Sequence, residues 1–258
     1  MVGEAKAAGR GFRTNFYLSD AAIESALRGG ELLALRSDGG VLMLKRERDL
    51  ARLYYAVAEP ARLPAALAQL TDRVCGVLVA DLIGRPEETA VFEPAFAEAG
   101  FSRYTRFLRM QKTMPAGLPT AEDDRLVKTA QPRDAEAVLA AIQGHFDPYC
   151  EHFPPLAEIR EAIARGTILV IRDGPRLAAL LYYDRTGLTT NFRYWIVEPG
   201  YRRHAYGDRL IRRYFRDCAG CRRSVLWVEE TNARAIPVHR WYGYQPDSVI
   251  DVILIKRP

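Results

Sequence analysis

The sequence lacks any apolar run long enough to cross a membrane. Its longest, LAALLYY at residues 177–183, is only as long as a strand, whereas a spanning helix needs roughly 18–20 apolar residues. The opening residues, MVGEAKAAGRGF, also lack the apolar core of a secretory leader. We therefore expect a cytoplasmic protein that makes no membrane contact.

Cysteine is scarce, with four residues in 258, at positions 75, 150, 218 and 221. The last two form a C-A-G-C motif, which is typical of a redox pair or of half a zinc site. Here the motif closes a helical pattern instead of opening one, and no second close pair of Cys or His completes a tetrahedral set. We expect reduced structural thiols and no bound metal.

No part of the chain carries a strong excess of one charge. The 37 lysines and arginines exceed the 32 acids only slightly, for a net charge of +5, and the excess is spread over both halves. A nucleic-acid-binding protein usually has a strongly basic face, so this balance argues against nucleic acid as a partner. With 48% apolar and 27% charged residues, the composition is that of a folded protein of one large or two modest domains.

Turn residues divide the chain into two halves with the same order of predicted elements. Each half has a hairpin around an Asp-Gly turn, at 38–39 and 173–174, and closes a helix with a Gly-aromatic pair, at 100–101 and 243–244. The segment MPAGLPTAEDD combines Pro, Gly and acids, which is typical of a linker. We expect a duplicated α/β unit, with domains at 1–117 and 125–258 joined by a linker at 118–124.

The stretch EPGYRRHAYGDRLIRRYF, residues 198–215, lies between a predicted strand at 189–197 and a helix predicted from Gly207 onward by its apolar spacing. The first N–H groups of a helix lack intrahelical partners, and the helix dipole favours an anion there. With Arg202 and Arg203 in the same loop, the pattern predicts a site for a diphosphate. The arginines further along the helix are interpreted as a solvated face: Arg212, Arg213 and Arg216.

Residues 197–210, VEPGYRRHAYGDRL, resemble the acetyl-CoA-binding signature of the GCN5-related N-acetyltransferase (GNAT) superfamily. Arg202, Ala205 and Gly207 occupy the characteristic positions of that signature, at the N-terminus of the family's central helix. Ala205 stands where glycine is usual, and its methyl group would interfere if the backbone there needed a positive φ. That departure puts the affinity for the cofactor in doubt.

A second stretch, LWVEETNARAIPVHRWYGYQP, resembles the later segment of the same family. It has a strand, then Asn232, Ala235 three residues on, and a helix that closes with Gly243 and Tyr244. The two resemblances cover about residues 125–258 and are in the family's order. Residues 1–117 fit the same fold only in outline, as a degenerate copy, and tandem arrangements of this kind occur in the superfamily.

The resemblance implies the fold class and the cofactor site. The expected fold is α/β (α+β), with two tandem GNAT-like domains, each a mixed, mostly antiparallel central sheet flanked by helices. Acetyl-CoA would be the co-substrate, with its pantetheine arm in a gap between two splayed strands, and no metal is implied. The residues expected to bind it are Trp195, Ile196, Val197, Arg202, Arg203, His204, Ala205, Tyr206, Gly207, Asp208, Asn232 and Ala235.

The catalytic assignments follow from the chemistry of amine acetylation. An alkyl amine has a pKa of about 10, so a base must remove a proton from the amine before the amine attacks the thioester. An acid must then protonate the departing thiolate. His239 stands where the family commonly has a tyrosine that acts as the general acid. It fits equally well as a residue that only packs against the cofactor. Tyr242 is a second candidate acid, and Glu229, at the end of a strand, is the candidate base. The residues that could line the acceptor pocket are Tyr182, Asp184 and Tyr194.

The function implied is acyl-CoA-dependent N-acetyl transfer to a primary amine by direct attack, with acetyl-CoA and an amine-bearing acceptor as partners. Two alternatives stay open: a transferase with a different acyl donor, and a non-catalytic module that senses CoA or binds a protein. The acceptor, the role of the first half and the oligomeric state, including a homodimer, are also left open.

Overall fold

The computed structural model describes residues 13–15, 23, 26–30, 32–37, 40–47, 49–57, 61, 63–71, 76–114 and 124–258. These residues group by their contacts into two compact units. The first unit comprises 1–108, 229–231 and 248–258, and the second comprises 109–228 and 232–247. The first unit therefore contains both ends of the sequence, and the second consists of two segments between them.

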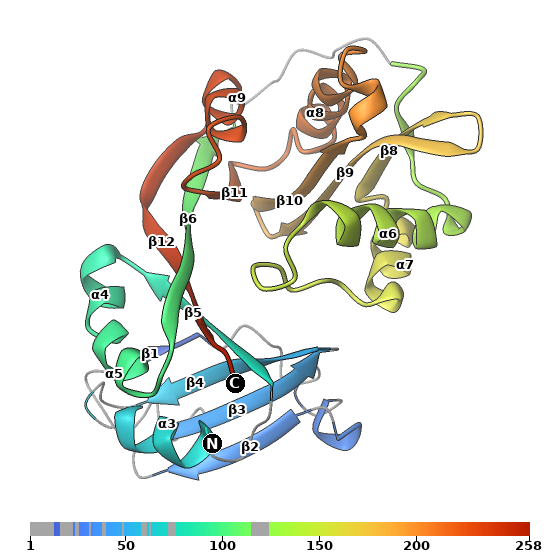
Figure 1. The fold of residues 1–258 in the computed structure, drawn as a ribbon. Coiled ribbons are helices and arrows are strands. Elements are labelled where there is room, and N and C mark those ends of the chain that lie inside the picture. Colours follow the sequence, from blue (N-terminus) through green and yellow to red (C-terminus); the bar gives the residue numbers. More distant parts are fainter. Residues whose placement is uncertain are drawn as a thin grey trace. The chain divides into compact units, whose positions relative to one another are not determined.

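The first unit is a mixed sheet with short helices (Figure 1). Its described elements are β1 (Arg13–Thr14), β2 (Leu32–Ser37), β3 (Gly40–Glu47), β4 (Leu50–Val57), α3 (Leu63–Thr71), β5 (Val77–Gly84), α4 (Pro86–Ala90), α5 (Glu93–Glu98), the first part of β6 (Ser102–Thr113) and the last part of β12 (Gln245–Lys256).

Strands β2, β3 and β4 of the first unit form an antiparallel meander, in which Ser37 pairs with Gly40 at the predicted hairpin. The turn residues 38 and 39 themselves lie outside the described residues. Strand β5 then runs parallel to β4, with Leu50 opposite Val77 and Leu53 opposite Ala80. Crossover through α3 makes this parallel pairing possible, because two parallel strands need a connection longer than a hairpin.

The last strand of the chain completes the first unit's sheet. Residues 250–256 of β12 pair antiparallel with 78–84 of β5. Val252 and Leu254 of this segment join the buried core of the first unit, together with Phe96 and Phe101. The fold of the first half therefore depends on residues at the end of the sequence.

The second unit carries the loop before α8 that contains Arg202 and Arg203, called the arginine loop below. Its elements are the end of β6, β7 (Lys128–Thr129), the 3-10 helix η2 (Pro132–Asp134), α6 (Ala135–His145), α7 (Leu156–Ala164), β8 (Ile168–Asp173), β9 (Arg176–Thr186), β10 (Thr189–Val197), η3 (Pro199–Tyr201), α8 (Tyr206–Asp217), β11 (Arg223–Glu229), α9 (Ala235–Trp241) and the start of β12.

Strands β7 to β10 form an antiparallel sheet in the second unit, and β11 then runs parallel to β10. Helices α6 and α7 cover one face of this sheet (Figure 1), where they bury Tyr182, Tyr194 and Ile196. Helix α8 packs on the other face, where the rings of Tyr183 and Tyr214 lie 5.0 Å apart. Alternation along the strands explains this division, because successive side chains point to opposite faces.

Strands β10 and β11 pair only where they begin. The parallel register joins Thr189 to Arg223, Thr190 to Ser224 and Asn191 to Val225, and no described pairing continues it toward Val197. On the other side, β10 pairs with β9 along its whole length, interrupted by a bulge between Phe192 and Tyr194. The two strands therefore diverge beyond Asn191 and leave a gap in the sheet.

These observations confirm the predicted fold class and the repeated order of elements. Both units have a three-stranded antiparallel meander followed by a strand parallel to its last member. The compact units differ from the contiguous domains predicted at 1–117 and 125–258, because β6 and β12 each contribute to both units. Among the residues described, no helix is long and apolar enough to span a bilayer.

We predict that a substitution near the C-terminus loosens the first half of the chain. Leu254 lies opposite Ala80 and is 3% exposed, so Leu254→Ala should leave a cavity and cost roughly 2–4 kcal/mol. Hydrogen exchange should speed up in β3, β4 and β5 while β8 and β9 keep their protection. The exposed Arg257→Ala is the control. Equal loss of protection in β8 and β9 would contradict this assignment of the strand.

Candidate functional site: the gap between β10 and β11 and the start of α8

The backbone at the start of α8 has the left-handed conformation that the usual glycine would tolerate. Ala205, the N-cap residue, has φ 54° and ψ 22°, and it is the only non-glycine residue with positive φ in the described part of the chain. An L-residue pays about 1–2 kcal/mol for this conformation. The sequence-based concern about a methyl group at this position is therefore justified: the turn does need a positive φ.

Gly207 allows the indole of Trp195 to lie directly against the first turn of α8. A Cβ atom at Gly207 would stand 3.0 Å from Trp195 Cζ2 and 3.3 Å from Cε2, which is closer than side chains normally approach. An alanine here would require the indole to shift by a few tenths of an ångström, so glycine suits this contact. Trp195 also contacts the rings of His239 and Tyr242, each at a centroid distance of 5.8 Å.

The arginine loop is open to solvent. Arg202, Arg203, His204 and Ala205 are exposed, and next to them the rings of His204 and Tyr206 stack at 5.3 Å. The helix arginines are instead bound to acids on α8. Arg212 contacts Asp208 at 2.7 Å and is exposed, as predicted for a solvated face, whereas Arg213, which contacts Asp217 at 2.8 Å, and Arg216 are half-buried.

The edge of β10 that faces the gap has free backbone groups. The N–H of Glu198 donates to the carbonyl of Ala178 on the β9 side. Because strand N–H groups alternate in direction, those of Trp195 and Val197 point away from β9, toward the side where β11 has diverged. No described residue on that side pairs with them. A ligand with amide or carbonyl groups could pair there as an extra strand does.

Two buried polar atoms lie beside the gap without a partner. Trp195 Nε1 and His239 Nδ1 are inaccessible to solvent and form no hydrogen bond within the described residues. A buried polar group without a hydrogen bond costs about 1–3 kcal/mol, so native structures rarely leave one unexplained. Here a donor and an imidazole nitrogen occur together in one aromatic cluster that also contains Phe192.

His239 is neutral at physiological pH. Its side chain is 8% exposed, and burial lowers its pKa to about 4. Tyr242 follows His239 by three residues, and its hydroxyl donates a hydrogen bond to Asp208 Oδ1 at 2.7 Å. Burial raises the pKa of the Tyr242 hydroxyl. Burial also raises the pKa of Asp208, but the hydrogen bonds from Arg212 and Tyr242 outweigh it, so the pKa lies below its ordinary value.

The remaining predicted residues have other contacts. Asn232 is exposed and accepts a hydrogen bond from the N–H of Ala235 at 2.9 Å, which fixes the start of α9. Glu229 groups by its contacts with the first unit and accepts a hydrogen bond from Thr105 Oγ1 at 2.7 Å. Its neighbour Glu230 forms an ion pair with Arg106.

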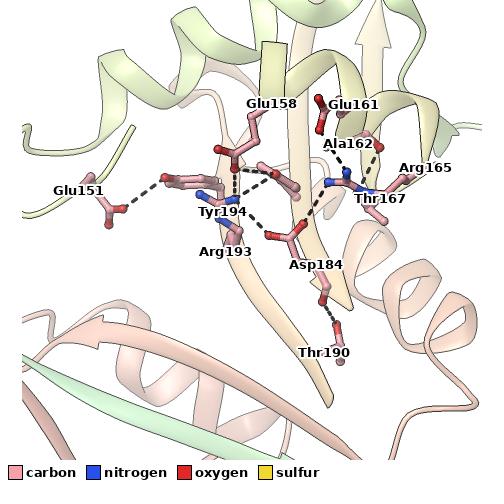
Figure 2. Close-up of polar contacts among 11 residues, drawn as sticks. Glu151, Glu158, Glu161, Ala162, Arg165, Thr167, Asp184, Thr190, Arg193 and Tyr194 are labelled. Atoms are coloured by element: carbon pink, nitrogen blue, oxygen red, sulfur yellow. Dashed lines mark hydrogen bonds and ion pairs between the residues drawn. The ribbon is translucent and has the colours of Figure 1, made fainter. Parts of the chain in front are cut away.

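Asp184 and Tyr194 lie beside Arg193, an arginine for which the sequence pattern predicted no role (Figure 2), and Tyr182 contacts the same guanidinium. Arg193 Nη1 donates to Glu158 Oε1 at 2.5 Å, to the Tyr182 hydroxyl at 3.0 Å and to Asp184 Oδ2 at 3.1 Å. The rings of Tyr182 and Tyr194 are buried under α6 and α7, and burial raises the pKa of both. The signal was available, since Arg193 interrupts the aromatic and apolar second part of the strand, residues 192–197.

A buried chain of hydroxyl groups fixes the point at which the strands diverge. Ser224 lies 2.6 Å from the hydroxyl of Tyr214 and 2.6 Å from that of Tyr244. Tyr214 also donates to Thr190, the residue that pairs with Ser224 across the two strands. The sequence pattern identifies Tyr244 only as part of a Gly-aromatic pair and does not predict its hydrogen bond with Ser224.

The cysteine and metal expectations concern the same unit. Cys218 and Cys221 are free and buried, and burial raises the pKa of Cys218 to about 11, which makes it unreactive. No group of three potential metal ligands occurs in the described part of the chain. Cys75 lies outside the described residues.

Comparisons with known proteins agree with this geometry. Residues 136–244 match the model of the acetyltransferase (GNAT) family. A GCN5-related N-acetyltransferase from Sphaerobacter thermophilus has a TM-score of 0.63 and 18% identity, over 93% of this chain and 87% of that one. A tandem GNAT protein from the clavulanic acid biosynthesis pathway has a TM-score of 0.62 and 18% identity, over 99% and 94%. A search of curated proteins found no significant match.

Residues 136–244 therefore match the GNAT acetyltransferase family, and the chain as a whole has the fold of a tandem GNAT protein. Both points confirm the resemblance inferred from the two sequence motifs. At 18% identity, the structural neighbours share the fold with this chain.

We predict that Gly207→Ala disturbs the Trp195 contact. The added methyl group would meet the indole at 3.0 Å, and the overpacking should cost roughly 1–2 kcal/mol despite the better helix propensity of alanine. Gly200→Ala is the matched control, because nothing lies within 4 Å of its added Cβ. Urea denaturation measures both, and equal stabilities of the two variants would contradict the contact.

We predict a pH dependence of stability that originates from His239. Its pKa is about 6.5 when unfolded and about 4 when folded, so the unfolded chain binds the proton more tightly. The contribution of His239 to the free energy of unfolding is complete above pH 6.5 and is lost as the pH falls toward 4. Between pH 8 and 4.5, the free energy of unfolding should fall by roughly 2–3 kcal/mol for this reason. His239→Phe should remove that part of the slope in urea titrations. An unchanged slope would show that the imidazole is not buried.

Proposed function

We propose that the chain is an acyl-CoA-dependent N-acetyltransferase, which transfers the acetyl group of acetyl-CoA to a primary amine by direct attack. The observation that carries the proposal is the gap beyond Asn191, with its free backbone groups on β10 and the start of α8 beside it. A flexible amide-containing arm that ends in a diphosphate matches both features.

The residues present fit acetyl-CoA in three ways. The N–H groups of Trp195 and Val197 would pair with the pantetheine arm, and that of Val197 would stabilise negative charge on the thioester carbonyl. The start of α8, with Arg202 and Arg203, would hold the pyrophosphate. The unpartnered Trp195 Nε1 and His239 Nδ1 lie covered beside the gap, so a shift of the two rings would give the arm an N–H donor and an imidazole nitrogen.

The full set of proposed cofactor residues keeps the sequence-based assignment. Main-chain groups of 195–197 and of the loop would supply most contacts, while side chains at the start of α9 would contribute at its edge. The residues assigned are Trp195, Ile196, Val197, Arg202, Arg203, His204, Ala205, Tyr206, Gly207, Asp208, Asn232 and Ala235.

The catalytic assignments are refined by the pKa of His239. An imidazole with a pKa of about 4 is neutral at pH 7 and a poor proton donor, so we assign His239 to binding the cofactor arm. Tyr242 keeps its proton at neutral pH and is proposed as the acid, which requires its hydroxyl to leave Asp208. Glu229, whose Oε1 accepts from Thr105, is retained as the proposed base acting through water.

One observation favours the non-catalytic alternative of a CoA-binding sensor. The neutral His239 replaces the family's usual acid, and Tyr242 is already bound to Asp208. The two functions differ in turnover. An enzyme releases CoA when an amine is supplied with acetyl-CoA, whereas a sensor binds acetyl-CoA and releases none.

We predict that Arg202→Ala/Arg203→Ala weakens acetyl-CoA binding at least tenfold, about 1.4 kcal/mol, in calorimetric titration. Two exposed cations at the proposed pyrophosphate site are removed, so the loss should shrink as the salt concentration rises. Arg133→Ala/Arg160→Ala is the control, because it removes the same charge from two exposed positions elsewhere, in η2 and in α7. Equal affinities of the two double variants would contradict the loop assignment, and the absence of binding to the wild type would contradict the function.

A further inference from the structure

Arg193 lies at the bulge of β10, on the sheet face that α6 and α7 cover. The bulge falls between Phe192 and Tyr194, and beyond it Tyr194 and Ile196 pack under α6 and α7. Phe192 and Trp195 point to the α8 face instead, where they contact Tyr214 and Gly207. Arg193 is thus separated by the sheet from the arginine loop, but lies only two residues along the strand from Trp195, roughly 7 Å.

The surroundings of Arg193 are those of a site for a cation. Carboxylates of Glu158 and Asp184 approach from α7 and β9 (Figure 2), and the guanidinium carbon lies 4.8 Å from the ring of Tyr182 and 5.5 Å from that of Tyr194. Acids combined with aromatic faces would suit a polyamine acceptor. Arg193 already fills this place, so the cluster does not hold a second cation in the same way.

One edge of the guanidinium is uncommitted. The three hydrogen bonds of ordinary geometry that Arg193 makes to described residues come from Nη1, the guanidinium also interacts with the Tyr194 hydroxyl, and Nε and Nη2 have no hydrogen bond of that geometry. These two nitrogens are not among the buried unsatisfied atoms, and the side chain is 25% exposed. The Nε–Nη2 edge of a guanidinium presents two parallel N–H donors, which match the two oxygens of a carboxylate.

We infer that Arg193 binds a carboxylate of the acceptor, so that the acceptor is an amine that also carries a carboxylate, such as an amino acid. This inference rests on the proposed transferase function. The two acids and two tyrosines hold the guanidinium in place and leave one planar edge for the ligand, which makes Arg193 a specificity-determining residue. Lysine could replace its charge but not its paired donors.

The test compares matched amines that differ only in the carboxylate. The probes are L-leucine with isoamylamine, L-phenylalanine with 2-phenylethylamine, and L-lysine with 1,5-diaminopentane. Each is titrated by calorimetry into the full chain saturated with CoA, so that binding is read without turnover. CoA release from acetyl-CoA is then measured for the same probes to obtain kcat and KM.

In the wild type, the acid of at least one pair should bind at least tenfold more tightly than its amine. Arg193→Lys keeps the ion pairs with Glu158 and Asp184 and should fold, but should lose most of this preference, mainly through KM. Arg160→Ala, an exposed arginine on the same α7, should keep it. Affinity for CoA itself should be unchanged in both variants.

Three outcomes would overturn the inference. They are an equal or tighter affinity for the amine in every pair, a preference that survives Arg193→Lys, and no binding of any of the three acids. Failure of the proposed function gives a different pattern. In that case no amine releases CoA from acetyl-CoA, while the binding data on the CoA-loaded chain still decide the carboxylate question.

Discussion

The second unit is organised by the point at which β10 and β11 stop pairing. Ser224 lies at that point, opposite Thr190, and the hydroxyls of Tyr214 and Tyr244 hold it from α8 and from the end of the α9 segment. A buried hydrogen-bonded network of this kind is rigid only when every member is satisfied. Here it fixes strands and helices together just before the divergence, so the gap has a defined origin and a free backbone edge.

The two faces of the sheet around this gap have different electrostatics. Toward α8 and α9, the wall is aromatic and uncharged, with a neutral His239 and an unpartnered indole N–H. Toward α6 and α7, the bulge at Arg193 gathers acids, a guanidinium and two tyrosine hydroxyls. A thioester arm would suit the first environment and a charged acceptor the second. The bulge itself accounts for the difference, because it shifts the alternation of side chains within a single strand.

Local sequence patterns predicted the parts of this site that depend on neighbours along the chain. The strand at 189–197 and the helix after the arginine loop follow from spacing, and the positive φ at residue 205 follows from the glycine that is usual there. The bulge at Phe192–Tyr194 and the hub at Arg193 could not be predicted in this way, because they depend on the register with β9 and on Glu158 from a distant helix. The pKa of His239 was likewise inaccessible, since it depends on how completely Trp195, Phe192 and Tyr244 enclose the ring.

Strands β6 and β12 each contribute residues to both units, so neither unit can be cut out as one continuous stretch of the chain. Residue Lys112 of β6 donates to the carbonyl of Tyr242 at 2.6 Å within the second unit, while residues 250–256 of β12 pair with β5 in the first. A fragment cut at the predicted linker would lose the Lys112 contact and would expose Val252 and Leu254, which belong to the first unit's core. The first half is therefore needed to bury the last strand. Burial of the last strand is thus a structural role of a half that lacks the arginine loop.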